Sequence, residues 1–160
     1  MAELIYLEDE AITYMFVSKA LKKLGHSVKH YWCAQELLED VDQILKEAEG
    51  EDEKLYFLLD HVNKRETNPD RIIGSDIAQK VLEKYENAHI VFGTGTAINS
   101  LPENIQKAID NQRVKYLAKP FRTNDLEQIY GDLGNLELKI TKNEDEYSTP
   151  PKQITRQYNF

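Results

Sequence analysis

Residues 55 to 60 read "LYFLLD". Its first five residues are apolar on both faces of an extended strand. This is typical of a central strand in a parallel sheet that helices cover on both sides. The run then stops on an acid, Asp60. We therefore predict a buried strand that carries a carboxylate at its carboxyl end.

On either side of this strand, short β-rich runs alternate with longer segments of helical period. Further strands are predicted at 4–8, 27–32, 89–93 and 114–118, and helices near 9–24, 34–49, 75–85, 102–111 and from 123. This alternation predicts an α/β fold with a doubly wound, five-stranded parallel sheet and helices on both faces. In the first helix, apolar residues recur at intervals of three and four and Gly25 is expected to cap the end. These apolar residues are Ile12, Met15, Phe16, Ala20 and Leu24.

The length of 160 residues fits one domain, which we place at 1–134, followed by a tail at 135–160. Apolar residues alternate with polar ones at the start of the tail, at Leu136, Leu138 and Ile140. The tail could therefore form an extra edge strand or an arm that binds a partner, including a second copy in a homodimer. A loosely held tail is the alternative.

Composition narrows the class of protein. A net charge of −8 without clustered Lys and Arg argues against direct nucleic-acid binding. No apolar run approaches the roughly 20 residues of a membrane span, and the acidic N-terminus does not resemble a secretory signal. The single cysteine, Cys33, fits a reducing compartment. We therefore expect a cytoplasmic protein without membrane or nucleic-acid partners.

Residues that end the strands are the candidates for chemistry, because ligands of doubly wound sheets bind outside the carboxyl ends of the strands. These residues are Glu8, Asp9, Asp60, Thr94 and Lys119. Three carboxylates in one crevice repel one another unless a cation intervenes, and all-oxygen ligation suits Mg²⁺. The lysine and the threonine hydroxyl would then hold phosphate oxygens, which leaves Asp60 as an in-line nucleophile for a phosphoryl group.

Four motifs in a fixed order resemble the receiver domain of two-component response regulators, the fold of chemotaxis regulators. They are "LEDE" (7–10), "FLLD" (57–60), "IVFGTG" (90–95) and "YLAKPF" (116–121). The resemblance covers residues 3 to about 134 and implies the flavodoxin-like strand order 2-1-3-4-5. It departs from the family after Asp60, where the loop is about six residues longer than is usual, and at Gly93, where an apolar side chain is common.

The resemblance also implies a role for each residue. Asp60 would accept a phosphoryl group from a phosphohistidine, and Thr94 and Lys119 would contact the aspartyl phosphate. Mg²⁺ or Mn²⁺ would be held by Glu8, Asp9, Asp60 and the backbone carbonyl of Val62. Tyr116 would be an aromatic switch that follows Thr94 inward, with Thr96 as a second candidate for the hydroxyl role.

Several alternatives stay open from the residues alone. Glu8 and Asp9 could cap the first helix. Tyr116 could be plain core, and His61 is expected to be a surface histidine rather than a catalytic one. The cis form of the Lys119–Pro120 bond is open as well.

The expected function is a phosphoacceptor without a DNA-binding output domain, whose phosphorylation switches a protein-interaction surface. It would be a switch with self-catalysed phosphorylation and dephosphorylation rather than an enzyme. Its partners would be a sensor histidine kinase or a histidine phosphotransfer protein, and an unknown downstream protein. The alternative is a receiver-fold binding module that phosphorylation does not regulate. A Mg²⁺-dependent aspartyl phosphatase is disfavoured, because Val62 stands where such enzymes carry a second acid.

Overall fold

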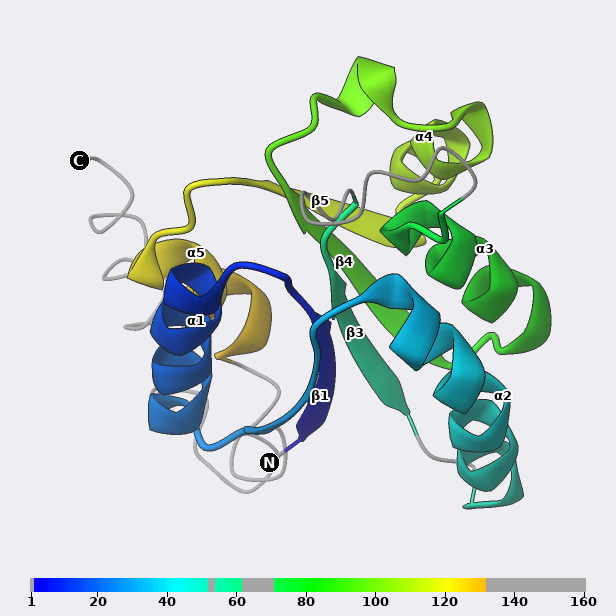
Figure 1. The fold of residues 1–160 in the computed structure, drawn as a ribbon, viewed down its shortest axis with the longest axis horizontal. Coiled ribbons are helices and arrows are strands. Elements are labelled where there is room, and N and C mark those ends of the chain that lie inside the picture. The colour runs from blue at the N-terminus through cyan, green and yellow to red at the C-terminus, as the bar shows by residue number, and fades with distance from the viewer. Residues whose placement is uncertain (1, 52–53, 62–70, 132–160) are drawn as a thin grey trace, which may run out of the picture.

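The computed structural model describes residues 2–51, 54–61 and 71–131. Its centre is a sheet of five parallel strands in the order β2-β1-β3-β4-β5, which confirms the predicted fold class and order (Figure 1). The boundary near residue 134 and the tail at 135–160 lie outside the described residues. The strands are β1 (Glu3–Leu7), β2 (Ser27–Tyr31), β3 (Leu55–Leu59), β4 (Ala88–Thr94) and β5 (Val114–Ala118).

Helices cover the sheet on both faces. Figure 1 shows α1 and α5 on one side and α2, α3 and α4 on the other. The helices pack against their neighbours in the same layer, α1 on α5, α2 on α3, and α3 on α4. The helices are α1 (Ala11–Lys23), α2 (Ala34–Glu51), α3 (Gly74–Lys84), α4 (Glu103–Asp110) and α5 (Thr123–Tyr130), with a short 3-10 helix η1 (Ile98–Ser100) before α4.

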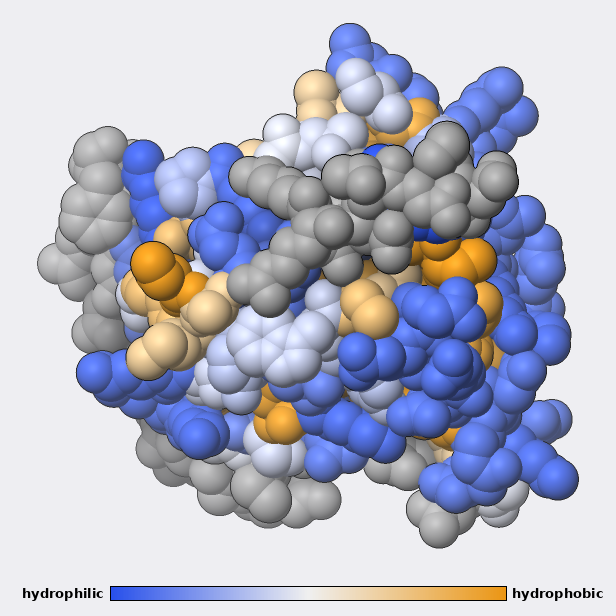
Figure 2. All heavy atoms as spheres, viewed as in Figure 1, coloured by the Kyte–Doolittle hydropathy of each residue, from blue (hydrophilic) through white to orange (hydrophobic). Residues whose placement is uncertain are grey.

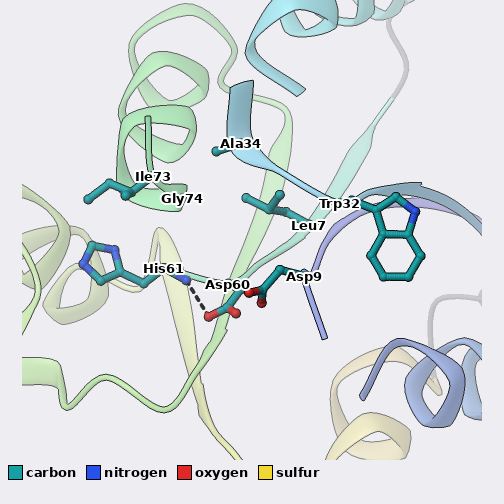
Figure 3. A pocket seen from close by; sticks show the side chains of 8 residues that line it. All are labelled: Leu7, Asp9, Trp32, Ala34, Asp60, His61, Ile73 and Gly74. Carbon is teal, nitrogen blue, oxygen red and sulfur yellow. Dashed lines mark hydrogen bonds between the residues drawn. The ribbon is translucent and has the colours of Figure 1, made fainter. Parts of the chain in front are cut away.

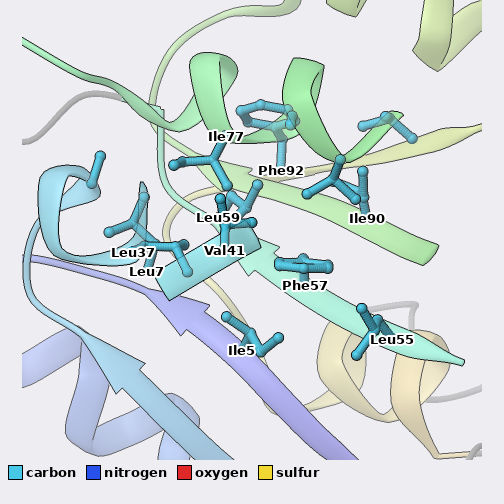
Figure 4. Packing of buried hydrophobic residues seen from close by; sticks show 14 of the residues in the cluster. Ile5, Leu7, Leu37, Val41, Leu55, Phe57, Leu59, Ile77, Ile90 and Phe92 are labelled. Carbon is cyan, nitrogen blue, oxygen red and sulfur yellow. The ribbon is translucent and has the colours of Figure 1, made fainter. Parts of the chain in front are cut away.

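The core has two layers because successive side chains of a strand point to opposite faces. In β3, Phe57 and Leu59 join the larger cluster under α2 and α3, whereas Leu58 joins the cluster under α1 and α5. Figure 4 shows the larger cluster, in which side chains of β1, β3 and β4 meet Leu37, Val41 and neighbouring helical residues. Both faces of "LYFLL" are therefore buried, as the sequence predicts.

Helix α1 packs differently from the predicted stripe. Its fully buried apolar residues are Val17 and Leu21, whereas Ile12 and Met15 are 80% and 67% exposed and Phe16 is 42% exposed. Ala20 and Leu24 of the predicted stripe do pack against the core, beside Tyr14. The helix thus has two apolar faces, and only one of them packs against the sheet.

The end of α1 agrees with the prediction that Gly25 caps it. Gly25 has a φ of +87°, a conformation that L side chains rarely adopt. Its N–H donates to the Lys22 carbonyl, and the N–H of His26 donates to the Leu21 carbonyl. This pair of hydrogen bonds is the Schellman motif, which satisfies carbonyls that a helix end leaves free.

Candidate functional site

Three acids meet at the carboxyl ends of β1 and β3. Because these strands are neighbours, the residues that follow them, Glu8, Asp9 and Asp60, come together. The backbone N–H of Asp60 donates to the Leu7 carbonyl, which continues the pairing one residue beyond β3. All three residues are buried, and each offers a carboxylate oxygen within 4.8 Å of the others. Figure 3 shows the carboxylates of Asp9 and Asp60 side by side.

Lys119 links two of these acids from the end of β5. Its Nζ lies 2.8 Å from Glu8 Oε1 and 3.0 Å from Asp60 Oδ2. The bond from Lys119 to Pro120 is cis. The glutamate is wholly buried, and the lysine side chain is 21% exposed. The ammonium group therefore bridges the acids with one side open to the groove described below.

Burial and the neighbouring charges shift the pKa values of Glu8 and Lys119. Burial, reinforced by the charge of Asp60, raises the pKa of Glu8 to about 6, although Lys119 acts in the other direction. Burial lowers the pKa of Lys119, but its hydrogen bond to Glu8 and the charge of Asp60 outweigh this and raise it overall. Lys119 is therefore charged at neutral pH. Three carboxylates against one ammonium leave a formal charge of −2, which one divalent cation would balance.

The donor set fits such a cation. Carboxylate oxygens are the ligands that Mg²⁺ and Mn²⁺ prefer, and the described residues hold no other group of His, Cys, Asp or Glu with metal-binding spacing. The fourth predicted ligand, the carbonyl of Val62, lies outside the described residues, as does most of the lengthened loop. Glu8 does accept a hydrogen bond from the Glu10 N–H at 3.2 Å. This bond does not cap the first turn of α1, because Glu10 is the residue that precedes the helix.

Thr94 and Tyr116 lie on the neighbouring strands. Thr94 ends β4 and is 1% exposed, and its Oγ1 accepts a hydrogen bond from the Thr96 N–H at 3.1 Å. The Tyr116 hydroxyl donates to the Thr96 carbonyl at 2.7 Å. The two side chains predicted to move together are thus tied to the same residue of the loop after β4.

A groove of about 760 Å³ joins Asp60, Thr94 and Lys119 to the surface. One wall is apolar and includes Ile12 and Phe16 of α1. Figure 2 shows apolar side chains gathered over the N-terminal half of α1, at the left of the view. Two residues of the exposed apolar face of α1 therefore line the same groove as Asp60. The remaining residues of the groove are Glu10, Thr13, Asp60, Thr94, Gly95, Thr96, Lys119, Pro120 and Phe121.

His61 corrects a prediction. It is 6% exposed rather than a surface residue. Its ring forms an edge-to-face pair with Phe92, with 6.2 Å between centroids. Figure 3 shows that the ring points away from the Asp60 carboxylate, while the backbone N–H of His61 donates to Asp60 Oδ1 at 2.8 Å. The start of α3 closes over this segment, because the Gly74 N–H donates to the His61 carbonyl at 2.9 Å. Packing beneath α3 thus buries the histidine, and burial lowers its pKa.

Sequence reasoning missed His30. Its Nε2 lies 2.8 Å from the carbonyl oxygen of Glu8, and its ring stacks on Tyr14 and meets the edge of Trp32. Burial lowers the pKa of this histidine. Its alternation within "SVKHYW" places it on one face of β2, but the bond to Glu8 follows only from the pairing of β1 with β2.

Comparison with solved structures shows which fold this is. The chain is similar to a CheY-like response regulator receiver domain from Methanospirillum hungatei, with 18% identity, 87% of this chain and 98% of that chain covered, and a TM-score of 0.60. It is also similar to the N-terminal domain of a response regulator/sensory box/GGDEF protein from Carboxydothermus hydrogenoformans, with 17% identity, coverage of 88% and 99%, and a TM-score of 0.60.

A third similar structure is the response regulator TrrA from Thermotoga maritima in complex with Mg²⁺ and beryllofluoride. It has 16% identity, coverage of 83% and 99%, and a TM-score of 0.56. No protein-family model and no curated protein matches the sequence. Within the described residues, none of the helices is both apolar enough and long enough to cross a membrane. The chain therefore has the fold of response regulator receiver domains over most of its length.

Proposed function

We propose that this chain, which has the receiver fold, is a phosphoacceptor of a two-component system or phosphorelay. A sensor histidine kinase or a histidine phosphotransfer protein would donate the phosphoryl group to Asp60. The observation that supports this most is that the strand-end residues gather at one end of the sheet, where three of them also line an open groove. The strand-end residues are Glu8, Asp9, Asp60, Thr94 and Lys119, and the three in the groove are Asp60, Thr94 and Lys119. The protein would act in the cytoplasm as a switch.

In this function, Asp60 attacks the phosphorus in line with the leaving imidazole. A new bond forms between Asp60 and phosphorus, while the phosphorus–nitrogen bond breaks and the imidazole leaves with its electron pair. Glu8, Asp9 and Asp60 would hold Mg²⁺ or Mn²⁺, which would neutralise charge on the phosphoryl oxygens. Lys119 would exchange its contact with Asp60 for a contact with a phosphoryl oxygen. The Thr94 hydroxyl would donate a hydrogen bond to another phosphoryl oxygen.

The switch would follow from that exchange. Thr94 now accepts the Thr96 N–H, and Tyr116 donates to the Thr96 carbonyl. A phosphate that engages Thr94 changes the loop after β4, and Tyr116 reports the change to the surface that α4, β5 and α5 form. A downstream protein would read that surface, so signalling would be a shift between two conformations.

The decisive experiment is intact mass after incubation with acetyl phosphate and Mg²⁺. We expect the gain of one phosphoryl group, and its loss in Asp60→Asn and in the presence of a chelator. Asp110→Asn, which changes an exposed acid at the end of α4, serves as the matched control and should be phosphorylated normally. If the native chain gains no mass, and beryllofluoride leaves the Tyr116 environment unchanged, the protein is a binding module that phosphorylation does not regulate.

A further inference from the structure

The carbonyl group of Glu8 has an unusual partner. Strand β1 ends at Leu7, and the Glu8 N–H donates to the Tyr31 carbonyl at 3.0 Å, just beyond the β1–β2 register. The Glu8 carbonyl oxygen lies 2.8 Å from His30 Nε2. Because a carbonyl only accepts, Nε2 must carry the proton and donate it. A side chain of β2 thus satisfies a backbone group as β1 leaves the sheet.

The imidazole of His30 is held from two sides. It stacks on the ring of Tyr14, with 3.8 Å between centroids and 13° between planes. It also forms an edge-to-face pair with Trp32, with 4.2 Å between centroids and 71° between planes. Tyr14 belongs to α1 and Trp32 follows β2, so two elements fix the ring, and therefore the donor, in place.

The hydrogen bond acts on the peptide unit that joins the two acids. The Glu8 carbonyl and the Asp9 N–H belong to one planar peptide group, so fixing the oxygen fixes the direction in which Asp9 leaves. The Glu8 side chain is attached to the Cα atom that this carbonyl follows. It accepts hydrogen bonds from Tyr6 and from the Glu10 N–H, and contacts Lys119. A rotation of this peptide would therefore displace both carboxylates relative to Asp60.

We propose that His30 is a positioning residue for the acidic pair. By holding the Glu8–Asp9 peptide, it sets the affinity of the site for a divalent cation and, through that affinity, the rate at which Asp60 is phosphorylated. The effect of His30 on the phosphorylation rate rests on the proposed function, whereas its effect on affinity concerns the binding of Mg²⁺ alone.

The test compares two substitutions of His30 in the full chain. His30→Phe keeps a flat ring for the stack on Tyr14 but removes the donor. His30→Gln loses the stack but carries an amide N–H that can reach the Glu8 carbonyl. His89→Phe is the matched control, because His89 is a partly buried strand histidine at the opposite end of the sheet and its buried Nδ1 has no hydrogen-bond partner.

Isothermal titration calorimetry gives the Mg²⁺ dissociation constant of each protein. Groups that orient metal ligands typically change affinity by about 10- to 100-fold when they are removed. We expect His30→Phe to weaken binding by about tenfold, His30→Gln to stay within about threefold of the native chain, and His89→Phe to bind like the native chain. Phosphorylation by acetyl phosphate at subsaturating Mg²⁺ should follow the same order, and saturating Mg²⁺ should reduce the differences.

Two results would overturn the proposal and leave the proposed function standing. One is native Mg²⁺ affinity in His30→Phe. The other is an equal loss of affinity in both His30 variants that matches their loss of stability in urea, because His30 would then act on the fold alone. If His30→Phe does not fold, His30→Leu replaces it as the variant without a donor. A native chain that gains no phosphoryl group and binds no Mg²⁺ would contradict both proposals.

Discussion

Gly93 shows how one missing side chain shapes the wall of the groove. A Cβ at this position would lie 2.5 Å from Cζ of Phe121 and 3.0 Å from Cδ1 of Leu58. The departure from the apolar residue common in receiver domains therefore has a local cause, because the Phe121 ring takes the space. Phe121 follows the cis Lys119–Pro120 bond and lines the groove.

We expect Gly93→Ala to destabilise the protein by about 1–3 kcal/mol, the usual cost of overpacking a well-filled core. Urea unfolding measures the change. Gly95→Ala is the matched control two residues away, because a Cβ there meets nothing within 4 Å, and it should be nearly neutral. Equal stability of the two variants would mean that Phe121 moves aside without cost.

His89 is expected to make the stability of the protein depend on pH. Burial, with the charges of Lys115 and Lys54, lowers the pKa of His89 to about 4. An unfolded chain has the ordinary value of about 6.5, so between these values it binds a proton that the folded chain does not. The stabilising contribution of neutral His89 is therefore complete above pH 6.5 and is lost as the pH falls towards 4.

Urea unfolding of the native chain and of His89→Gln at pH 7.5 and pH 5 checks this. Between these two pH values, the native free energy of unfolding should fall more than that of the variant, by at most about 2 kcal/mol. The lowered pKa values of His30 and His61 affect both proteins alike, so the difference isolates His89. Parallel pH profiles would show that His89 titrates normally in the fold.

At the scale of elements, α1 has a face that the fold itself does not use. Ile12, Met15 and Phe16 are exposed, and two of them line the groove that leads to Asp60. A protein that delivers a phosphoryl group to Asp60 has to cover this face, whereas a small donor does not.

We therefore expect Ile12→Gln combined with Met15→Gln to slow transfer from a phosphorylated histidine protein at least tenfold, while phosphorylation by acetyl phosphate stays within about twofold. Stability should change little, because the side chains are exposed. Ile98→Gln, an exposed apolar residue of η1 outside the groove lining, is the control. Equal slowing with both donors would place the effect at Asp60 and not at a docking surface.

The same helix shows which parts of the structure could be predicted from sequence. The strand-end residues Glu8, Asp60 and Lys119 could be placed together, because parallel strands bring their carboxyl ends to one edge. The buried face of α1 could not be predicted, because apolar residues occupy two adjacent faces of this helix. Only packing on the sheet selects which of the two faces is buried. His30 was missed for a related reason: its partner lies on another strand, and only the strand order brings the two together.

At the scale of the whole molecule, His26 joins three parts of the chain. It is 3% exposed, its Nδ1 accepts the Ala2 N–H at 3.1 Å, and its Nε2 donates to the Tyr130 carbonyl at 2.8 Å. The turn after α1 is thereby tied both to the start of β1 and to the end of α5. This connection supports the packing of α5 beside α1.

His26→Phe should destabilise the chain by about 1–3 kcal/mol, because it leaves the Ala2 N–H and the buried Tyr130 carbonyl without their hydrogen bonds to the imidazole. Hydrogen exchange followed by mass spectrometry would locate the effect. Amides of α5 should exchange faster, whereas those of α3, which packs on the other face of the sheet, should change less. Uniform acceleration across both helices would mean that His26 stabilises the fold globally rather than through α5.

Trp32 contacts the ring of His30 and lines a small pocket with Asp9 and Asp60 (Figure 3). It is also the one tryptophan in the sequence. Fluorescence excited at the red edge of the aromatic absorption band therefore comes from a single indole, and this indole lines the same pocket as two of the acids. Stopped-flow measurement of Trp32 fluorescence could therefore give the rates of cation binding and phosphorylation at the carboxylates in an unlabelled protein.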